Sequence, residues 1–212
     1  MLTHDAFSQR WENDIVEQLK IKELSIDKAK HGDIPQTSNI PKFNDILLNW
    51  NGSTSGACYP FSTFKKKSQD GLIIADITSA AFCMEIPWSD LDASAFSWQK
   101  GLGGEAGIGV LVLSPKALNR LETYEPSWPV PYLLQLRDKK GVKFEIFQER
   151  TINTPSMISV EDFINALSWA KDQKEVKSVT AISKENLKVV EEWVEKTDWV
   201  GFLTEKKNNR SS

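Results

Sequence analysis

Hydrophobic positions along the chain follow two spacings. Four short apolar runs have the length of buried strands; they lie at residues 46–48, 72–75, 93–96 and 110–113. Other apolar residues recur at helical spacing, at Ile15, Val16, Leu19 and Leu24 and from about Ser183 to Val194. A further helix should begin near Ser159, because Ser159 and Asp162 have the spacing of a capping box. Strands alternating with helices predict an α/β sheet with helices on its faces.

One lysine follows the third strand and leads into a glycine-rich turn. Lys100 comes shortly after residues 93–96, and glycines follow at positions 101, 103 and 104. Glycine lets a backbone approach a ligand closely, and apolar and aromatic neighbours would partly desolvate the amine. Desolvation disfavours the charged ammonium and leaves a nucleophile suited to a Schiff base. A single lysine is more often a solvated surface charge, so its surroundings must decide between these roles.

An acidic residue ends the second apolar run. Asp76 directly follows residues 72–75, and open α/β sheets place their ligand groups at the carboxyl ends of strands. An aspartate beside threonine and serine is also a common helix N-cap, so that role stays open. Paired with Lys100, Asp76 suggests a pyridoxal phosphate site. There the lysine forms the Schiff base and the carboxylate pairs with the protonated ring nitrogen.

Five segments together carry a specific resemblance. They are residues 76–82 (DITSAAF), 96–105 (FSWQKGLGGE), 109–115 (GVLVLSP), 120–124 (RLETY) and 151–156 (TINTPS). They resemble the phosphoserine aminotransferases, class V enzymes of fold type I that use pyridoxal phosphate, and most of all the alphaproteobacterial and archaeal branch. The resemblance extends over nearly the whole chain.

The resemblance implies an α/β fold in two parts. Residues 1–155 would form the cofactor-binding large domain, without its N-terminal part, around a mixed, mostly parallel sheet with helices on both faces. Residues 156–212 would form a connecting helix and the start of a smaller C-terminal domain. Chains of the family are longer, with a phosphate-binding loop upstream and a substrate-binding arginine downstream. The sequence is therefore expected to be an internal fragment that is inactive by itself.

Four residues acquire roles at one cofactor site. The resemblance makes Lys100 the Schiff-base lysine and Asp76 the partner of the pyridine nitrogen. Ser53 falls where the family usually has a threonine that hydrogen-bonds the phenolic oxygen, and a serine hydroxyl can do the same. Gln99 matches a residue that contacts the cofactor phosphate. Ser53 lies two residues after Asn51, and the pair Asn51-Gly52 is also an ordinary tight-turn signal.

Three more residues acquire roles that involve the ring and a second subunit. Asn153 and Thr154 match a pair that reaches the phosphate of the neighbouring subunit, which implies a homodimer with shared active sites. Trp11 matches an aromatic residue that stacks on the pyridine ring. Each has a structural alternative, because residues 153–155 also suit a loop before a helix and Trp11 also suits the core.

The resemblance implies transfer of an amino group between glutamate and 3-phosphohydroxypyruvate in serine biosynthesis. Ile108 stands where this branch often has histidine, and Arg150 stands where an acid commonly precedes Thr151. An apolar side chain at a substrate contact would weaken polar recognition. The alternatives are a serine–glyoxylate aminotransferase, a cysteine desulfurase or a catalytically inactive fragment. A desulfurase typically has histidine before its lysine, and Gln99 argues against it.

Composition fits a soluble enzyme. The 212 residues suffice for one large domain, and a net charge of −3 gives no sign of nucleic-acid or membrane binding. Cys58 and Cys83 are too few for a disulfide framework, and the two histidines, at positions 4 and 31, are too distant from them to suggest a metal site. Without a membrane-length apolar run or a signal peptide, a cytoplasmic location is expected. Residues 65–67 are interpreted as a solvated basic turn, and residues 206–212 as a loose tail.

Overall fold

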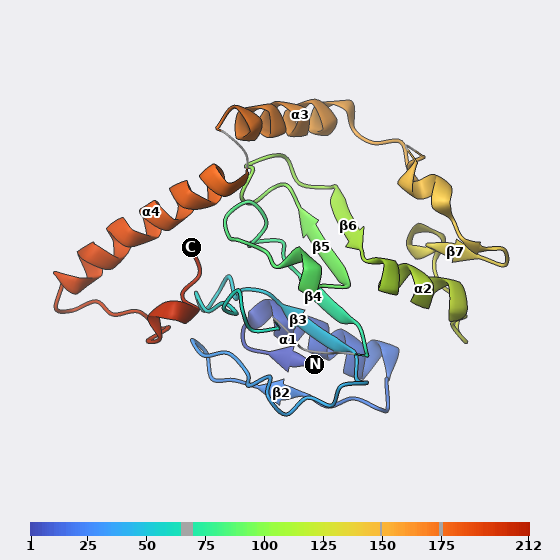
Figure 1. The fold of residues 1–212 in the computed structure, drawn as a ribbon, viewed down its shortest axis with the longest axis horizontal. Helices are drawn as coiled ribbons and strands as arrows, with labels where there is room; N and C mark the ends of the chain where they lie inside the picture. The colour runs from blue at the N-terminus through green and yellow to red at the C-terminus, as the bar shows by residue number, and fades with distance from the viewer. Residues whose placement is uncertain (65–69, 149, 174–175) are drawn as a thin grey trace.

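A six-stranded sheet forms the centre of the protein (Figure 1). The computed structural model describes residues 1–64, 70–148, 150–173 and 176–212. The strands are β1 (Leu2–Thr3), β2 (Asp27–Lys28), β3 (Ile46–Asn49), β4 (Ile73–Asp76), β5 (Ala93–Ser97) and β6 (Gly109–Leu113), in the order β2-β1-β3-β4-β5-β6. Strands β1 to β5 are parallel to their neighbours, and β6 is antiparallel to β5. The predicted mixed, mostly parallel sheet is confirmed.

Helices surround this sheet. They are α1 (Ala6–Asn13), which a π-helical segment continues over Asp14–Leu19, α2 (Pro115–Thr123), α3 (Met157–Asp172) and α4 (Val176–Glu195). Short 3-10 turns lie at Trp88–Asp90, Tyr132–Leu134, Phe144–Phe147 and Lys207–Asn209, and β7 (Arg137–Asp138) pairs with β8 (Gly141–Val142). Helix α1 contacts β1 and β3, α2 contacts β6 and β8, and α3 contacts α4. In Figure 1, α3 and α4 lie outside the sheet.

Alternation along β3 and β4 separates a core face from a second face. Ile46 of β3 and Ile73 of β4, with every second residue after them, belong to the main hydrophobic core. Successive side chains of a strand point to opposite faces, so Asn49 and Asp76 share the second face, where they are directly opposite in the parallel register. The core continues beyond the strands into packed aromatic rings: Trp50, Tyr59 and Phe64.

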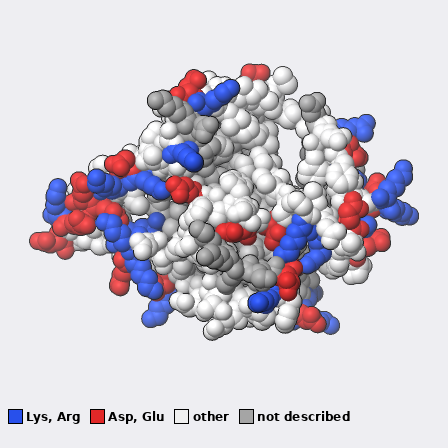
Figure 2. Space-filling view, viewed as in Figure 1, with Lys and Arg blue, Asp and Glu red and all other residues white. Residues whose placement is uncertain are grey.

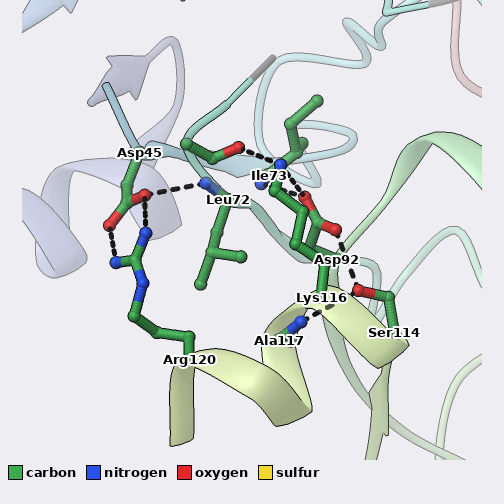
Figure 3. A network of polar contacts seen from close by, with 9 residues as sticks. Asp45, Leu72, Ile73, Asp92, Ser114, Lys116, Ala117 and Arg120 are labelled. Atoms are coloured by element: carbon green, nitrogen blue, oxygen red, sulfur yellow. Dashed lines mark hydrogen bonds and ion pairs between the residues drawn. The ribbon is translucent and has the colours of Figure 1, made fainter. Parts of the chain in front are cut away.

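Asp45 fixes the amino ends of β3 and β4 (Figure 3). It directly precedes β3 and accepts the backbone N–H of Leu72, just before β4, at 2.7 Å. Its other oxygen accepts from Arg120 of α2 at 3.0 Å. The amino end of the β3–β4 pair is thereby attached to helix α2.

Asp92 has the same role on the other side of β4. It directly precedes β5 and accepts the backbone N–H of Ile73 at 2.9 Å and the hydroxyl of Ser114 at 2.8 Å. The ammonium of Lys116 lies 3.5 Å from the same carboxylate. The two aspartates therefore link three neighbouring strands to α2 at one edge of the sheet (Figure 3).

The four predicted strands are confirmed to within one residue at each end. The first helix ends earlier than predicted, at Leu19, because Lys20 adopts the left-handed conformation with φ 53°. Helix α3 starts close to the predicted position, but Ser156 caps it and Asp162 instead accepts the backbone N–H of Glu105. The predicted capping box is therefore wrong. Helix α4 begins seven residues before Ser183.

The expectation of a loose C-terminal tail is wrong. Cys58 donates its backbone N–H to the carbonyl of Asn209 at 2.7 Å, and Ser211 donates to the carbonyl of Gly56 at 2.8 Å. Arg210 pairs with the buried Glu191 of α4 at 2.8 Å. These backbone and ionic contacts hold the tail against residues 51–58, which a polar composition alone could not reveal.

Charged side chains of both signs are interspersed on the face seen in Figure 2, and many lie over α4. The basic run predicted as a solvated turn, residues 65–67, lies outside the described residues. Within the described ranges, no helix combines the length and the hydropathy needed to cross a bilayer.

Candidate active site

A cavity of about 200 Å³ opens where β3, β4 and β5 end. It is lined by Phe7, Asn49, Asn51, Ser53, Asp76, Thr78, Ser79, Gln99 and Lys100. Four of these were predicted at a cofactor site: Ser53, Asp76, Gln99 and Lys100. Carboxyl ends of parallel strands meet at one edge of the sheet, which is why residues far apart in sequence gather there.

Asp76 is the last residue of β4 and is half-buried. One carboxylate oxygen accepts the backbone N–H of Thr78 at 2.9 Å, and the other accepts the amide of Asn49 at 3.1 Å. The alternative role of helix N-cap is wrong, since turns and not a helix follow Asp76. Among the described residues no cation pairs with Asp76, so its negative charge is available to a ligand.

Lys100 lies on the turn that follows β5. The turn closes through a hydrogen bond from the Gly103 N–H to the Lys100 carbonyl at 2.9 Å. Two glycines are required here, because Gly103 has φ +70° and a Cβ on Gly101 would lie 2.5 Å from the carbonyl oxygen of Ala81. Lys100 is exposed, so the predicted partial burial of its amine is wrong. The glycine turn places Lys100 beyond the end of β5, where the lysine lines the cavity.

Helix α3 holds this turn from outside the sheet. Trp98 is buried and stacks on Phe163 of α3 with ring centroids 3.9 Å apart. Asp162, the neighbour of Phe163, accepts the backbone N–H of Glu105 at 2.8 Å. The position of Lys100 therefore depends on β5 and on packing against α3.

Hydroxyl groups line another wall of the cavity. The Ser53 and Ser79 hydroxyls lie 2.7 Å apart. Ser53 belongs to the loop against which the C-terminal tail packs, and Asn51 in the same loop donates its amide to the Ser211 hydroxyl at 2.9 Å. The tail and this wall are therefore one connected structure.

Helix α1 contributes an aromatic residue, but not the predicted one. Phe7 lines the cavity, whereas Trp11, four residues later, is half-buried and does not line it. Residues four apart share a helix face, so Trp11 lies one turn further along the face that Phe7 presents to the cavity. Asp5 caps α1 through the backbone N–H groups of Phe7 and Ser8 and so fixes the first turn at this edge.

The two residues expected to act across a subunit interface lie elsewhere. Asn153 and Thr154 are exposed in the loop before α3 and do not line the cavity. The two positions that depart from the family pattern, Ile108 and Arg150, do not line it either. Sequence reasoning missed Asn49, whose signal was a polar residue closing an apolar run, and the hydroxyl groups of Thr78 and Ser79.

Burial shapes the electrostatics around the cavity. Desolvation lowers the pKa of His4, which is buried next to the loop of Ser53 and packs edge-on against Tyr59. Burial also raises the pKa of Cys58 to about 12. At that pKa the thiol is protonated near neutral pH, so Cys58 is not a nucleophile.

One protein-family model matches almost the whole chain. The family model described as "Aminotransferase class-V" matches residues 3–212. The chain belongs to the class-V aminotransferase family. The class V membership predicted from the sequence is therefore confirmed.

The chain is also similar to individual proteins and to solved structures. The phosphoserine aminotransferase of Methanosarcina mazei is 43% identical over 212 residues, which cover 100% of this chain and 57% of that protein. A phosphoserine aminotransferase structure from Cytophaga hutchinsonii matches with a TM-score of 0.81 and 20% identity over 99% of this chain and 59% of that one. A structure described as PLP-bound phosphoserine aminotransferase, from Trichomonas vaginalis, matches with a TM-score of 0.66 and 16% identity over 99% and 57%. The structural matches confirm the predicted fold type I, and the chain spans less than two thirds of each relative's length.

Proposed function

We propose that this chain carries the cofactor-binding part of a phosphoserine aminotransferase, which uses pyridoxal phosphate to transfer an amino group between glutamate and 3-phosphohydroxypyruvate. One observation carries the proposal: Asp76 and Lys100 line the same cavity from the ends of neighbouring strands. Neither has an ion-pair partner among the described residues. A carboxylate and an amine are the two groups that this cofactor requires of its protein. The name of the 43% identical relative supports the substrate pair.

The cavity residues fit pyridoxal phosphate. A cavity of about 200 Å³ lies below the roughly 300–1,000 Å³ of drug-sized ligand sites, as suits a single substituted ring. The carboxylate of Asp76 can accept from a protonated ring nitrogen, and the Ser53 hydroxyl can donate to a phenolate. The Gln99 amide can donate to a phosphate. The ring nitrogen, the phenolic oxygen and the phosphate of the cofactor thus each have at least one complementary side chain in the cavity wall.

When bound, the cofactor supplies an electron sink for the charge that develops at the substrate α-carbon. Asp76 would hold the proton on the ring nitrogen, because two neutral donors orient its carboxylate and no cation among the described residues pairs with it. Lys100 would hold the cofactor through a covalent bond from its amine. As a free amine, Lys100 would move a proton at the substrate α-carbon.

The proposal includes a shared site in a homodimer. Asn153 and Thr154 are exposed and lie outside the cavity of their own chain, which suits a pair that reaches the phosphate in the neighbouring subunit. A two-fold axis would then form two equivalent sites. We propose that residues 1–155 belong to the large domain and 156–212 lead into the smaller one. The free thiols of Cys58 and Cys83 suit a reducing cytoplasm.

Covalent labelling tests the assignment of the lysine. A full-length protein that carries this chain is incubated with pyridoxal phosphate, reduced with borohydride and mapped by peptide mass spectrometry. We expect the label on Lys100 and no label there in Lys100→Ala. Lys184→Ala is the matched control, since Lys184 is an exposed lysine that pairs with Glu85 and does not line the cavity. A label on a different lysine contradicts the proposed function.

Turnover tests the substrate. We expect a full-length protein that carries this chain to use 3-phosphohydroxypyruvate with glutamate and to discriminate strongly against hydroxypyruvate, because buried cations would lose their phosphate partner. Equal turnover of the two keto acids would point to a different class-V aminotransferase.

Mixing of two inactive variants tests the shared site. Lys100→Ala and Asn153→Ala/Thr154→Ala of that full-length protein are combined under conditions of subunit exchange. We expect activity to return, since each mixed dimer holds one intact site. If subunits exchange and no activity returns, the result contradicts the proposal of a shared site.

A further inference from the structure

Asn49 contacts the carboxylate of Asp76 from the neighbouring strand. Asn49 ends β3 and lies directly opposite Asp76 in the parallel β3–β4 register. Its amide donates to one carboxylate oxygen of Asp76 at 3.1 Å. The other oxygen is held by the N–H of Thr78, which lies in the turn that Asp76 itself begins. Among the described residues, only the bond from Asn49 ties the Asp76 carboxylate to a separate element of the sheet.

Folding alone does not explain an asparagine at this position. The rest of β3 is apolar, and Asn49 is 3% exposed. Its side-chain oxygen is buried without a hydrogen-bond partner among the described residues, which is unfavourable for a polar group. Rotation of the amide would not help, because its oxygen would then face a carboxylate. An apolar residue would suit the strand better, so the asparagine serves the cavity that it lines.

We propose that Asn49 is a positioning residue that holds the Asp76 carboxylate in the orientation that meets the ring nitrogen of the cofactor. This inference rests on the proposed function and adds to it a residue that acts through Asp76. Asn49 limits rotation of the Asp76 side chain about its own bonds. A preorganised carboxylate loses less freedom when the ligand binds, and that saving appears as affinity.

A double comparison of ligands and variants isolates this role. Affinities of a full-length protein that carries this chain are measured by quenching of tryptophan fluorescence. The two ligands are pyridoxal phosphate and 1-deazapyridoxal 5′-phosphate, in which carbon replaces the ring nitrogen. The variant is Asn49→Leu, which keeps the approximate size of the side chain and removes the donor. The matched control is Asn51→Leu, because Asn51 is also a buried asparagine that lines the cavity but donates to Ser211 and not to Asp76.

We expect Asn49→Leu to weaken binding of pyridoxal phosphate about tenfold, the effect of one hydrogen bond to a charged group, and to weaken binding of the deaza analogue less than about twofold. We expect Asn51→Leu to change both affinities by the same factor. The free energy of unfolding of Asn49→Leu should equal or exceed that of the original protein, because the substitution removes the buried side-chain oxygen that has no hydrogen-bond partner among the described residues. A residue with a merely structural role would lower stability and weaken both ligands equally.

The outcomes separate this inference from the proposed function. Equal weakening of both ligands by Asn49→Leu, with wild-type binding intact, overturns the role of Asn49 and leaves the proposed function standing. Wild-type protein that does not distinguish the two ligands overturns the pairing of Asp76 with a ring nitrogen. Wild-type protein that binds neither ligand overturns the proposed function and this inference with it.

Discussion

The two edges of the central sheet use aspartates in opposite ways. At the amino edge, cations accompany the carboxylates: Asp45 pairs with Arg120, and Asp92 lies near Lys116. At the carboxyl edge, Asp76 accepts only from the neutral donors of Asn49 and Thr78 among the described residues. The charge at the first edge is neutralised within the fold, whereas the charge at the second remains for a ligand. Position relative to strand direction, and not residue type, separates aspartates that are paired with cations from the aspartate that is not.

The edges also differ in what surrounds the carboxylates. Asp45 and Asp92 accept the backbone N–H groups that begin β4, so they satisfy donors that the ladder leaves unpaired. At the carboxyl edge, the Asn49 side-chain oxygen and both ring nitrogens of His4 are buried without a partner within the described ranges. Stability is thus concentrated at one edge and the capacity to bind at the other, as expected where function competes with folding.

Removal of an aspartate at the amino edge should have the largest effect on stability. Asp92→Ala removes the acceptor for Ile73 and Ser114 and leaves their donors without it. Hydrogen bonds to charged groups contribute roughly 1.5–3 kcal/mol each, so we expect a loss of about 3 kcal/mol in the free energy of unfolding, measured with urea. A loss below about 1 kcal/mol would show that this edge is not where stability is concentrated.

Removal of the charge at the carboxyl edge should affect cofactor binding more than the stability of the fold. We expect Asp76→Asn to weaken pyridoxal phosphate binding about 10- to 100-fold, which corresponds to one charged hydrogen bond. The free energy of unfolding should fall by less than that of Asp92→Ala, because the substitution removes one of two acceptor oxygens and breaks no ion pair within the described chain. Fluorescence titration and urea unfolding of the same sample measure both quantities. A loss in the free energy of unfolding as large as that of Asp92→Ala would show that the two edges do not differ in this way.

Acidification should destabilise the carboxyl edge through His4. Burial lowers the pKa of His4 in the folded protein below the ordinary value of 6.5 for histidine, so below that pH the unfolded state binds more protons than the folded state. Stability should therefore fall as the pH drops below 6.5, by at most about 1.4 kcal/mol per pH unit for one proton. His4→Phe keeps an aromatic ring against Tyr59 and should remove this component. An identical pH dependence in both proteins would exclude His4 as its source.

The exposed ion pair of the amino edge should have the smallest effect. Arg120 and Asp45 are each 43% exposed at the side chain, and pairs of this kind contribute roughly 0.2–1 kcal/mol. We expect Arg120→Ala to lower the free energy of unfolding by about 0.5 kcal/mol, and by less in high salt, where the pair is screened. A loss comparable with that of Asp92→Ala would show that the cation, and not the capping of β4, stabilises this edge.

Local pattern and motif order predicted much of the site. The apolar runs located β3 to β6, and the residues that end or follow two of them, Asp76 and Lys100, lie together in the cavity. The sequence was less informative where packing between elements decides which side chain reaches the cavity. Phe7 and Trp11 share a helix face, and only the cap at Asp5 and the placement of α1 decide which of them reaches the cavity.

The sequence by itself determined the strand positions, the class-V family and the strand-end carboxylate and amine, because apolar runs and residue order are local properties of the chain. Only the tertiary structure decided that Asn49 contacts Asp76, that Lys100 is exposed, and that the tail at Ser211 packs against the loop of Asn51. These contacts join residues up to 160 positions apart. They depend on strand register and packing between elements, which no local pattern specifies.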